Sequence, residues 1–408
     1  MLDTRVEGDG IAMPDMRAIE ALAPSCQTPF YLFDEGAVAK RIAHLRCFLP
    51  ARAHICYAMK ANPFILKCAA RACDFVEACS PGELEICRAL GIPPEKIVVS
   101  GVYKEPANMR DIVRSGAKVH RFTIESPAQF DLLESIARDE GTIIPVILRL
   151  TSGNQFGMDA GDLELIARKC AVSRYVECRG IQFFSGTQKT QKKIAREIEM
   201  LDSFMAEFSK DCGCDAPELE YGPGIPIDYC EQDAHRAEST DRDFLELLGE
   251  KLAYMRFQGA LTLEIGRGIA ACSGVYVTRI VDVKRNRGRN YAIADGGKHQ
   301  LVYYGQALAL KPPACQTFPQ RNSGDNASWA ICGALCTAND IMVKQIDVDD
   351  LRVGDYVAFP NAGAYCMTEG MASFLSRDMP RIYLSDGTNP PKLVRDRIET
   401  SSFNTPMA

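Results

Sequence analysis

Long apolar segments are absent from this sequence. No apolar run approaches the length of a membrane span, and the first twenty residues lack the charged-then-apolar pattern of a secretory signal. A strong charge imbalance is also missing, since the formal net charge is only −6. That balance gives no reason to expect nucleic acid or an anionic membrane as a partner. We therefore expect a cytoplasmic protein that is not attached to a membrane.

The cysteines form no regular framework. The chain has 17 of them, an odd number, and they lie scattered in apolar segments, which is typical of reduced core thiols in a cytosolic protein. The one tight pair is Cys212-Gly213-Cys214. None of the five histidines is close to it, so we predict a loop there and no metal site.

A dinucleotide-binding fingerprint, Gly-x-Gly-x-x-Gly after an early strand, is also missing, which disfavours an open Rossmann-type sheet.

The chain has 408 residues, of which 47% are apolar and 25% are charged, as expected for a soluble protein of two domains. Short β-rich runs alternate with stretches of helical periodicity as far as residue 268. Eight such units favour a closed (β/α)8 barrel. The predicted strands are 53–58, 74–78, 96–100, 118–124, 143–149, 177–183, 217–222 and 260–265.

The pattern changes after residue 268. Strand-like segments and turns such as Arg287-Gly288 follow one another without a long helical period, which predicts an all-β domain. The stretch 311–326 is rich in proline, glycine and polar residues and is predicted to be a surface loop. The predicted fold is thus an α/β protein. Its barrel spans 30–268, and its β domain is built from 1–29 and 269–408.

One lysine stands out within the barrel. Residues 54–59 are mostly apolar and predict a buried strand, Lys60 comes where that strand ends, and Asn62-Pro63 breaks the pattern. Burial at such a place disfavours the ammonium form, and a neutral amine can form a Schiff base with an aldehyde cofactor. The structural alternative is a lysine that extends to solvent from a strand end.

Other strand ends support the cofactor hypothesis, because the reactive groups of such barrels cluster there. Gly222-Pro223-Gly224 and Gly266-Arg267-Gly268 are glycine turns after late strands, where backbone N–H groups commonly bind phosphate. Glu264 could pair with a pyridinium nitrogen and keep it protonated. Its structural alternative is a salt bridge with Arg149 or Arg267.

Nine short motifs, in order along nearly the whole chain, resemble those of the pyridoxal phosphate (PLP)-dependent decarboxylases with the alanine-racemase-like fold, the diaminopimelate and ornithine decarboxylase group. They are Thr28-Pro29-Phe30-Tyr31, Tyr57-Ala58-Met59-Lys60-Ala61-Asn62, Ser80-Pro81-Gly82-Glu83-Leu84, Gln155-Phe156-Gly157-Met158, Gly186-Thr187-Gln188, Glu264-Ile265-Gly266-Arg267, Ala294-Asp295-Gly296-Gly297, Cys332-Gly333-Ala334-Leu335-Cys336 and Asn361-Ala362-Gly363-Ala364-Tyr365.

The resemblance implies roles for particular residues. Lys60 would hold PLP through a Schiff base, and Cys336 would reach into the barrel of a partner subunit to protonate the carbanion after CO2 leaves. A homodimer with shared active sites follows from that arrangement. The candidate cofactor contacts are Lys60, Glu77, Phe184, Thr187, Gly222, Gly224, Glu264, Gly266, Arg267 and Tyr365. The candidate substrate contacts are Arg149, Asp295, Thr337 and Glu369.

The chain departs from the family in three places. Phe184 stands where the family usually has a histidine over the cofactor ring, so stacking is kept without a polar ring. Pro223 removes one N–H from the phosphate turn. Thr337 stands where diaminopimelate decarboxylases have glutamate and ornithine-type enzymes have aspartate, and a neutral hydroxyl cannot neutralise a distal ammonium.

Thr337, together with Gln155-Phe156-Gly157-Met158-Asp159 and Gly186-Thr187-Gln188, is similar to the branch that decarboxylates a glutamyl group tethered to an acyl carrier protein in butirosin biosynthesis. We expect a decarboxylase for a small amino-acid substrate, free or carrier-bound. Diaminopimelate decarboxylase proper is the nearest alternative, with Glu369 as a possible acidic contact. A PLP-dependent racemase and a non-catalytic PLP-binding protein are further alternatives.

Overall fold

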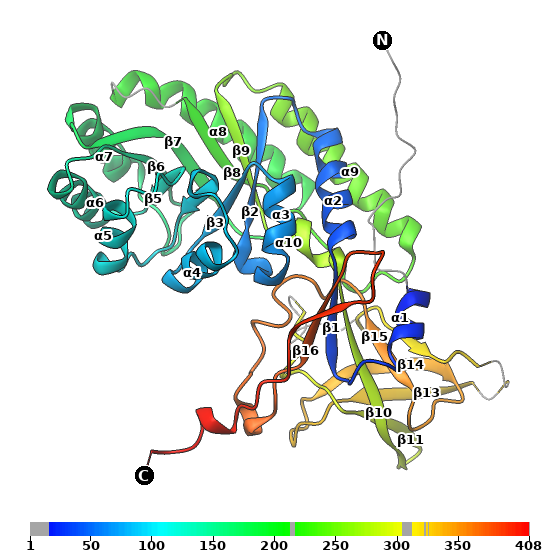
Figure 1. Ribbon diagram of the computed structural model, residues 1–408. Coiled ribbons are helices and arrows are strands. Elements are labelled where there is room, and N and C mark those ends of the chain that lie inside the picture. The colour runs from blue at the N-terminus through cyan, green and yellow to red at the C-terminus, as the bar shows by residue number, and fades with distance from the viewer. Residues whose placement is uncertain (1–15, 213–216, 304–311, 322–323, 325, 408) are drawn as a thin grey trace. The chain divides into compact units, whose positions relative to one another are not determined.

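The computed structural model describes residues 16–212, 217–303, 312–321, 324 and 326–407 (Figure 1). The chain divides into two compact units. The barrel unit comprises residues 42–226 and 241–269, and the sheet unit comprises residues up to 41, 227–240 and 270–408. Among the described helices, none is both long and apolar enough to cross a membrane.

Eight parallel strands close into a barrel in the barrel unit, which confirms the predicted fold class. Each strand pairs with its successor along the chain, and β9 closes the ring by pairing with β2. The strands are β2 (Ala53–Ala58), β3 (Phe75–Ala78), β4 (Ile97–Val99), β5 (Arg121–Ile124), β6 (Ile144–Leu150), β7 (Val176–Phe184), β8 (Glu218–Gly222) and β9 (Ala260–Ile265). All eight lie within three residues of their predicted bounds.

Helices follow the strands, as a parallel sheet requires. They are α2 (Glu35–Phe48), α3 (Leu66–Ala72), α4 (Pro81–Ala89), α5 (Pro106–Arg114), α6 (Pro127–Asp139), α7 (Ala160–Val172), α8 (Gln191–Cys212), α9 (Ala234–Ala253) and α10 (Arg267–Ala270). The loop predicted at Cys212–Cys214 falls mostly outside the described residues, because α8 extends to Cys212 and 213–216 are not described.

Local chemistry explains where two of these helices begin. At α4, the Ser80 hydroxyl accepts a hydrogen bond from the Glu83 N–H, and the Glu83 carboxylate accepts one from the Cys79 N–H at 2.6 Å. This reciprocal pair is a capping box, and Pro81 occupies the first helical position. At α6, the Ser126 hydroxyl accepts from the Gln129 N–H in the same way. The strand-to-helix turns at the barrel mouth are therefore specified by adjacent residues.

The sheet unit is built around a sheet in the order β14-β13-β11-β10-β1-β16-β17, with β15 and β12 paired alongside β10. Its elements are α1 (Met16–Leu22), β1 (Phe30–Asp34), β10 (Gly274–Asn286), β11 (Arg289–Ala294), β12 (Gln316–Phe318), β13 (Asn326–Cys332), β14 (Ile341–Asp349), β15 (Tyr356–Phe359), β16 (Arg381–Ser385) and β17 (Lys392–Arg395). Arg287 and Gly288, both with positive φ, form the predicted turn between β10 and β11.

Two expectations about this part of the chain are corrected. Residues 30–34, placed in the barrel by the sequence, form β1 of the sheet, antiparallel to β10 and parallel to β16. Part of the predicted loop 311–326 is strand β12, which pairs with β15. In both cases the partner strand lies far away in sequence, so the local pattern could not reveal it. The side chains of Phe30 and Leu32 belong to the sheet unit's apolar core.

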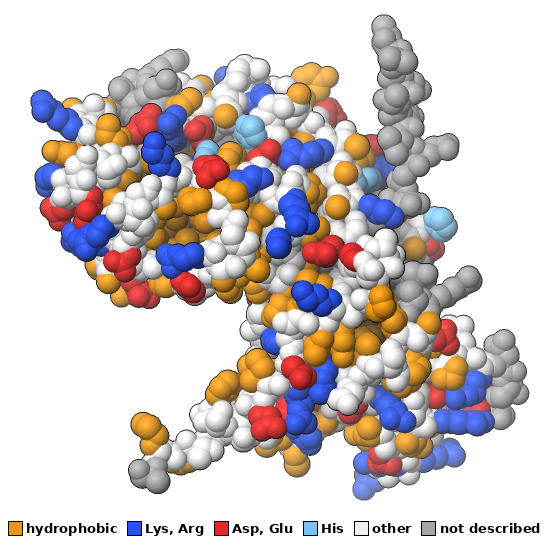
Figure 2. All heavy atoms as spheres, in the orientation of Figure 1, with side chains coloured by type: hydrophobic (Ala, Val, Ile, Leu, Met, Phe, Trp, Pro, Cys, Tyr) orange, Lys and Arg blue, Asp and Glu red, His pale blue; other side chains and the backbone are white. Residues whose placement is uncertain are grey.

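Charged side chains of both signs are interspersed on the face drawn in Figure 2. That distribution agrees with the small net charge of −6.

The barrel interior is less usual, because it contains a buried ion-pair cluster. Arg121 on β5 donates to both Glu218 and Glu220 on β8, and Arg121 and Glu220 are almost completely inaccessible to solvent. A charge at this depth is stable only while its partners remain.

We expect Arg121→Met to destabilise the protein by about 3–5 kcal/mol, because it leaves the buried Glu220 carboxylate without its cation and also removes the partner of the partly exposed Glu218. The matched control is Arg114→Met, which removes an exposed pair with Glu140 at 3.1 Å and should cost less than about 1 kcal/mol. Urea unfolding of the two variants measures the difference. Equal losses in both would contradict the role given to Arg121.

Candidate active site at the mouth of the barrel

Lys60 lies just beyond the C-terminal end of β2. The strand stops at Ala58, and Met59–Ala61 form a single 3₁₀ turn. Asn62 fixes the chain that follows, since its side-chain oxygen accepts from the Phe64 N–H at 3.0 Å and its carbonyl accepts from the Tyr57 hydroxyl at 2.9 Å. The lysine is thereby held at the barrel mouth, with a side chain that is 36% exposed.

The strands on either side of β2 bring two carboxylates to this lysine. Glu77 on β3 is paired with Ala58 of β2, and Glu264 on β9 is paired with Cys56 of β2. Lys60 Nζ lies 2.6 Å from Glu77 Oε2 and 3.1 Å from Glu264 Oε1. Three residues predicted separately from the ends of three strands therefore form one cluster.

The pKa values of the two carboxyl groups are shifted in opposite directions. Burial and the neighbouring Glu77 raise the pKa of Glu264 to about 8, although Lys60 opposes this shift. Burial acts on Glu77 in the same direction, but the closer Lys60 ammonium outweighs it and lowers the pKa of Glu77 to about 2. Glu264 therefore holds its proton more tightly than Glu77 does.

Sequence reasoning missed the residues beneath Glu264. The Gln182 amide on β7 donates to Glu264 Oε2 at 3.2 Å and to Glu220 Oε1 at 3.0 Å. This links the lysine cluster to the Arg121 ion pairs deeper in the barrel. Gln182 lies in a strand whose side chains alternate in direction, so its inward position was readable from the sequence, while its partners were not.

Cys79 is another neighbour that was not predicted. Its sulfur lies 3.7 Å from Lys60 Nζ, just after β3. Burial raises the pKa of this thiol well above its ordinary value, with Glu77 acting in the same direction, so the sulfur stays protonated beside the lysine. The local sequence shows a cysteine before a helix cap, and only the barrel closure puts it beside Lys60.

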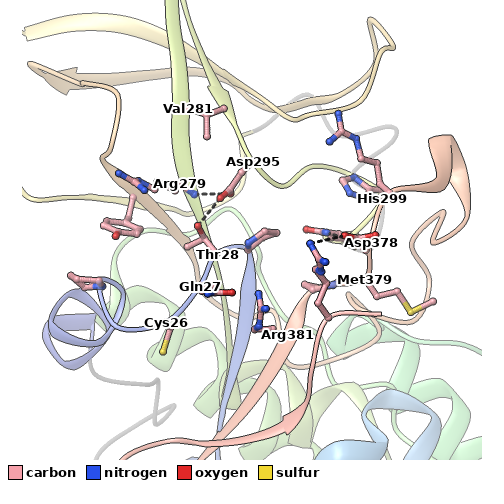
Figure 3. A pocket seen from close by; sticks show the side chains of 17 residues that line it. Cys26, Gln27, Thr28, Arg279, Val281, Asp295, His299, Asp378, Met379 and Arg381 are labelled. Atoms are coloured by element: carbon pink, nitrogen blue, oxygen red, sulfur yellow. Dashed lines mark hydrogen bonds and ion pairs between the residues drawn. The ribbon is translucent and has the colours of Figure 1, made fainter. Parts of the chain in front are cut away.

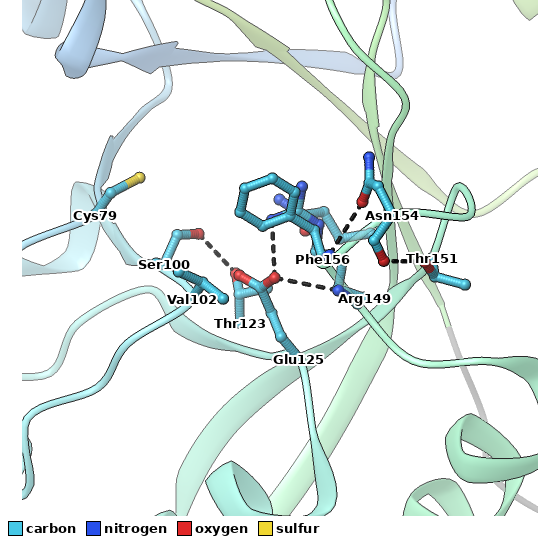
Figure 4. Close-up of polar contacts among 12 residues, drawn as sticks. Cys79, Ser100, Val102, Thr123, Glu125, Arg149, Thr151, Asn154 and Phe156 are labelled. Carbon is cyan, nitrogen blue, oxygen red and sulfur yellow. Dashed lines mark hydrogen bonds and ion pairs between the residues drawn. The ribbon is translucent and has the colours of Figure 1, made fainter.

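Arg149 does not pair with Glu264. It lies 3.1 Å from Glu125 Oε2 instead, and its guanidinium stacks over the Phe156 ring at 4.8 Å (Figure 4). The Gly157 N–H also donates to Glu125, at 3.2 Å. Glu125 was not predicted as part of the site, and it fixes the loop that follows β6. The role of Arg149 as a substrate contact stays a prediction.

The two predicted phosphate turns lie next to each other. A Cβ added to Gly268 would fall 2.9 Å from Ile225 Cβ, which follows the first turn directly. Gly224 has φ +59°, and a side chain there would fall 2.5 Å from the Gly186 carbonyl oxygen. Thr187 accepts a hydrogen bond from Arg267 Nε at 3.3 Å, and Phe184 packs against Gly222 so closely that no Cβ fits.

The remaining predicted residues belong to the sheet unit. Asp295 accepts hydrogen bonds from the hydroxyls of Thr28 and Thr278, both at 2.6 Å, so it is held within the sheet. Cys336 is exposed, and Thr337 is partly exposed. Tyr365, with φ 64°, has a carbonyl that accepts from the N–H of Glu369, whose side chain is exposed. How these residues approach Lys60 stays a prediction.

A cavity of about 530 Å³ lies within the sheet unit (Figure 3). Its lining includes Thr28, Arg279, Asp295, His299 and Arg381. Of the residues predicted to be functional, the lining contains Asp295, which is engaged by Thr28 and Thr278. We therefore locate the candidate site at Lys60, where a lysine, two carboxyl groups and two glycine turns come together.

Comparison with known proteins identifies the family of this chain. Residues 35–271 match the family model of the pyridoxal-dependent decarboxylases, pyridoxal binding domain. Diaminopimelate decarboxylase of Aquifex aeolicus is 26% identical over 378 residues, covering 88% of this chain and 86% of the relative. The L-glutamyl-[BtrI acyl-carrier protein] decarboxylase of Niallia circulans is 25% identical over 397 residues, covering 90% of each chain.

Solved structures share the fold. Diaminopimelate decarboxylase from Helicobacter pylori, in complex with L-lysine, superposes with a TM-score of 0.82 at 21% identity, covering 94% of this chain and 98% of the other. Lysine/ornithine decarboxylase from Vibrio vulnificus, in complex with putrescine, gives a TM-score of 0.78 at 19% identity, covering 92% of this chain and 99% of the other. At this level of identity the likeness extends to the fold alone.

The fold and the lysine site define a PLP enzyme with an alanine-racemase-like barrel. The chain belongs to the pyridoxal-dependent decarboxylases, so it is a PLP-dependent amino-acid decarboxylase. This family is favoured over the racemase and the non-catalytic alternatives.

The residues present fit the cofactor. Lys60 supplies an amine, Glu264 supplies a buried carboxyl group, and the two glycine turns pack so closely against their neighbours that a side chain at Gly222, Gly224 or Gly268 would collide with them. The buried Gln182 Oε1 has no hydrogen-bond partner among the described residues, so this part of the barrel can still accept a donor.

The raised pKa of Glu264 predicts a pH dependence for the cofactor-free protein. The folded state keeps a proton that the unfolded chain releases above the ordinary value of 4.5. The stabilisation is complete below that value and is lost as pH rises through about 8. The free energy of unfolding should fall between these limits by up to about 1.4 kcal/mol per pH unit for one proton.

Urea unfolding at a series of pH values measures this slope. Glu264→Gln should make the slope of unfolding free energy against pH less negative, by about the amount expected for one proton. Glu250→Gln, which changes an exposed carboxylate on α9, should leave the slope unaltered. If the wild type and Glu264→Gln gave parallel curves, Glu264 would have to be ionised in the folded protein at neutral pH.

Proposed function

We propose that this protein decarboxylates an amino acid at Lys60, using Cys336 of a second subunit as the proton donor. The observation that carries the proposal is the Lys60 amine, held between two buried carboxyl groups in the barrel of a pyridoxal-dependent decarboxylase. When bound, PLP supplies an aldehyde that takes up the amino group and a pyridinium ring that accepts the electron pair left by the carboxylate.

The candidate cofactor contacts divide into those that hold the cofactor and those that set its charge. Lys60 provides the attachment point, and the turns at Gly222–Gly224 and Gly266–Gly268 provide the phosphate contacts, together with Arg267 and Tyr365. Glu264 faces the pyridine nitrogen and keeps a positive charge there. Its burial supports this role, because the attraction between a carboxylate and a pyridinium is stronger away from water.

Cys336 would deliver the proton that replaces the carboxylate. It is exposed and lies in a tight turn, where the Thr337 N–H donates to the Leu335 carbonyl at 2.8 Å and the Asp340 carboxylate accepts from the Leu335 N–H at 2.8 Å. An exposed thiol on a fixed turn is suited to enter the barrel of another subunit. The Sγ proton would pass to one face of the α-carbon, and solvent would restore it. This arrangement requires a homodimer.

Thr337 indicates a substrate without a distal ammonium. A buried ammonium needs a counter-charge, and threonine has none. The Niallia circulans relative is named for a glutamyl group on an acyl carrier protein, which supports a neutral or carrier-bound side chain as one candidate. Diaminopimelate is the second candidate. It is favoured by the names of several relatives and by Glu369, whose exposed carboxylate could replace the missing acid.

The substrate candidates can be separated by measuring CO2 release from diaminopimelate, lysine, ornithine and free or carrier-tethered glutamate. We expect the wild type to prefer a substrate without a distal ammonium. Thr337→Glu should shift the ratio of kcat/KM toward ammonium-bearing substrates by about tenfold or more, because it supplies the counter-charge. Thr337→Gln has the same size without the charge and should not do so. A wild type that prefers diaminopimelate would favour the second candidate.

The shared active site predicts complementation between two inactive variants. Lys60→Ala should lose the yellow colour of the bound cofactor, and Cys336→Ala should keep it, with little activity in either. Mixed and allowed to exchange subunits, they should recover about a quarter of wild-type activity, since half the dimers are hybrids and each hybrid has one intact site. Cys47→Ala, which removes another exposed cysteine, is the control. No recovery despite demonstrated exchange would mean that Cys336 acts within its own subunit or not at all.

A further inference from the structure

Lys189 is a buried lysine directly behind the first phosphate turn. Its side chain has 0% exposure, and its ammonium lies over the ring of Tyr221 at 4.9 Å and that of Phe184 at 5.6 Å. It follows β7 in the short segment before α8, outside every motif identified in the sequence. Burying a lysine cation is costly unless several groups satisfy it, so its partners indicate what it does.

Lys189 binds the turn at both ends. Its Nζ donates to the Gly222 carbonyl at 2.7 Å, and its backbone N–H donates to the Gly224 carbonyl at 3.0 Å. Because a trans peptide directs its N–H opposite to its C=O, the Ile225 N–H points away from Lys189. Pro223 has no N–H to offer. The few donors that remain in this turn can serve an anion only if their orientation is fixed, and Lys189 fixes it from behind.

A single carboxylate holds Lys189 in place. Glu197 on α8 accepts from Lys189 Nζ at 2.7 Å, from the Tyr221 hydroxyl at 2.8 Å and from the Ser185 hydroxyl. These contacts join the ends of β7 and β8 to the helix that follows. Burial lowers the pKa of Lys189, and the hydrogen bond to Glu197 opposes that shift and so favours the cation.

We infer that Lys189 is a positioning residue for the phosphate group of the cofactor: it orients the carbonyls of the Gly222-Pro223-Gly224 turn so that the remaining N–H groups of this turn face the phosphate. The inference rests on the proposed location of the phosphate at this turn. Pro223 leaves this turn with one N–H donor fewer than a turn of three glycines would have. The orientation of the remaining donors therefore matters more, and Lys189 fixes that orientation.

The test compares equilibrium binding of PLP and of pyridoxal, which lacks the phosphate, to cofactor-free protein. Lys189→Met should weaken PLP binding by roughly ten- to hundredfold, whereas pyridoxal binding should change by less than about threefold. Lys192→Met makes the same change at an exposed position three residues away and should alter neither. Absorbance of the bound aldehyde follows both titrations without reference to activity.

Each outcome distinguishes a separate failure. If Lys189→Met weakens PLP and pyridoxal binding equally, or weakens neither, the positioning role is wrong. If the wild type binds PLP no better than pyridoxal, the proposed phosphate site itself fails. Should Lys189→Met not fold, Glu197→Gln removes the carboxylate that fixes Lys189 at nearly constant volume. It is expected to reduce the preference for PLP over pyridoxal, and an unchanged preference would overturn the inference.

Discussion

The contact between the Lys60 ammonium and two buried carboxyl groups is the interaction on which the site depends. Glu77 is buried and depends on the Lys60 cation to keep its carboxylate ionised, whereas the more distant Glu264 responds to burial by holding its proton. Burial raises the pKa of Glu264, while the closer Lys60 ammonium outweighs burial at Glu77 and lowers the pKa of that group.

This cluster is the upper end of a longer polar path through the barrel. Glu264 contacts Gln182, Gln182 contacts Glu220, and Glu220 pairs with Arg121. Such an interior is more expensive than a purely apolar one, since each buried polar group must find a partner. The closed ring of strands makes it feasible, because side chains from β5, β7, β8 and β9 are held facing one another at fixed spacing.

The prediction from sequence succeeded where a residue's role depends on its immediate neighbours. Strand positions, the Ser80 cap, the Arg287-Gly288 turn and the location of Lys60 at a strand end all follow from short-range patterns. It failed at Phe30–Asp34, whose partners β10 and β16 are distant in the chain. It also gave no sign of Glu125, Cys79 or Lys189, because an acid, a thiol or a lysine between a strand and a helix is commonplace until its partners are known.

By itself, the sequence determined the fold class and the cofactor, since these depend on the period of the strands and on motifs at their ends. The tertiary structure alone decided which carboxyl group holds its proton more tightly, that Arg149 pairs with Glu125, and that Lys189 contacts the Gly222-Pro223-Gly224 turn. The reason is physical: proton affinities and ion pairs depend on distances of a few ångströms between residues that the closure of the barrel brings together.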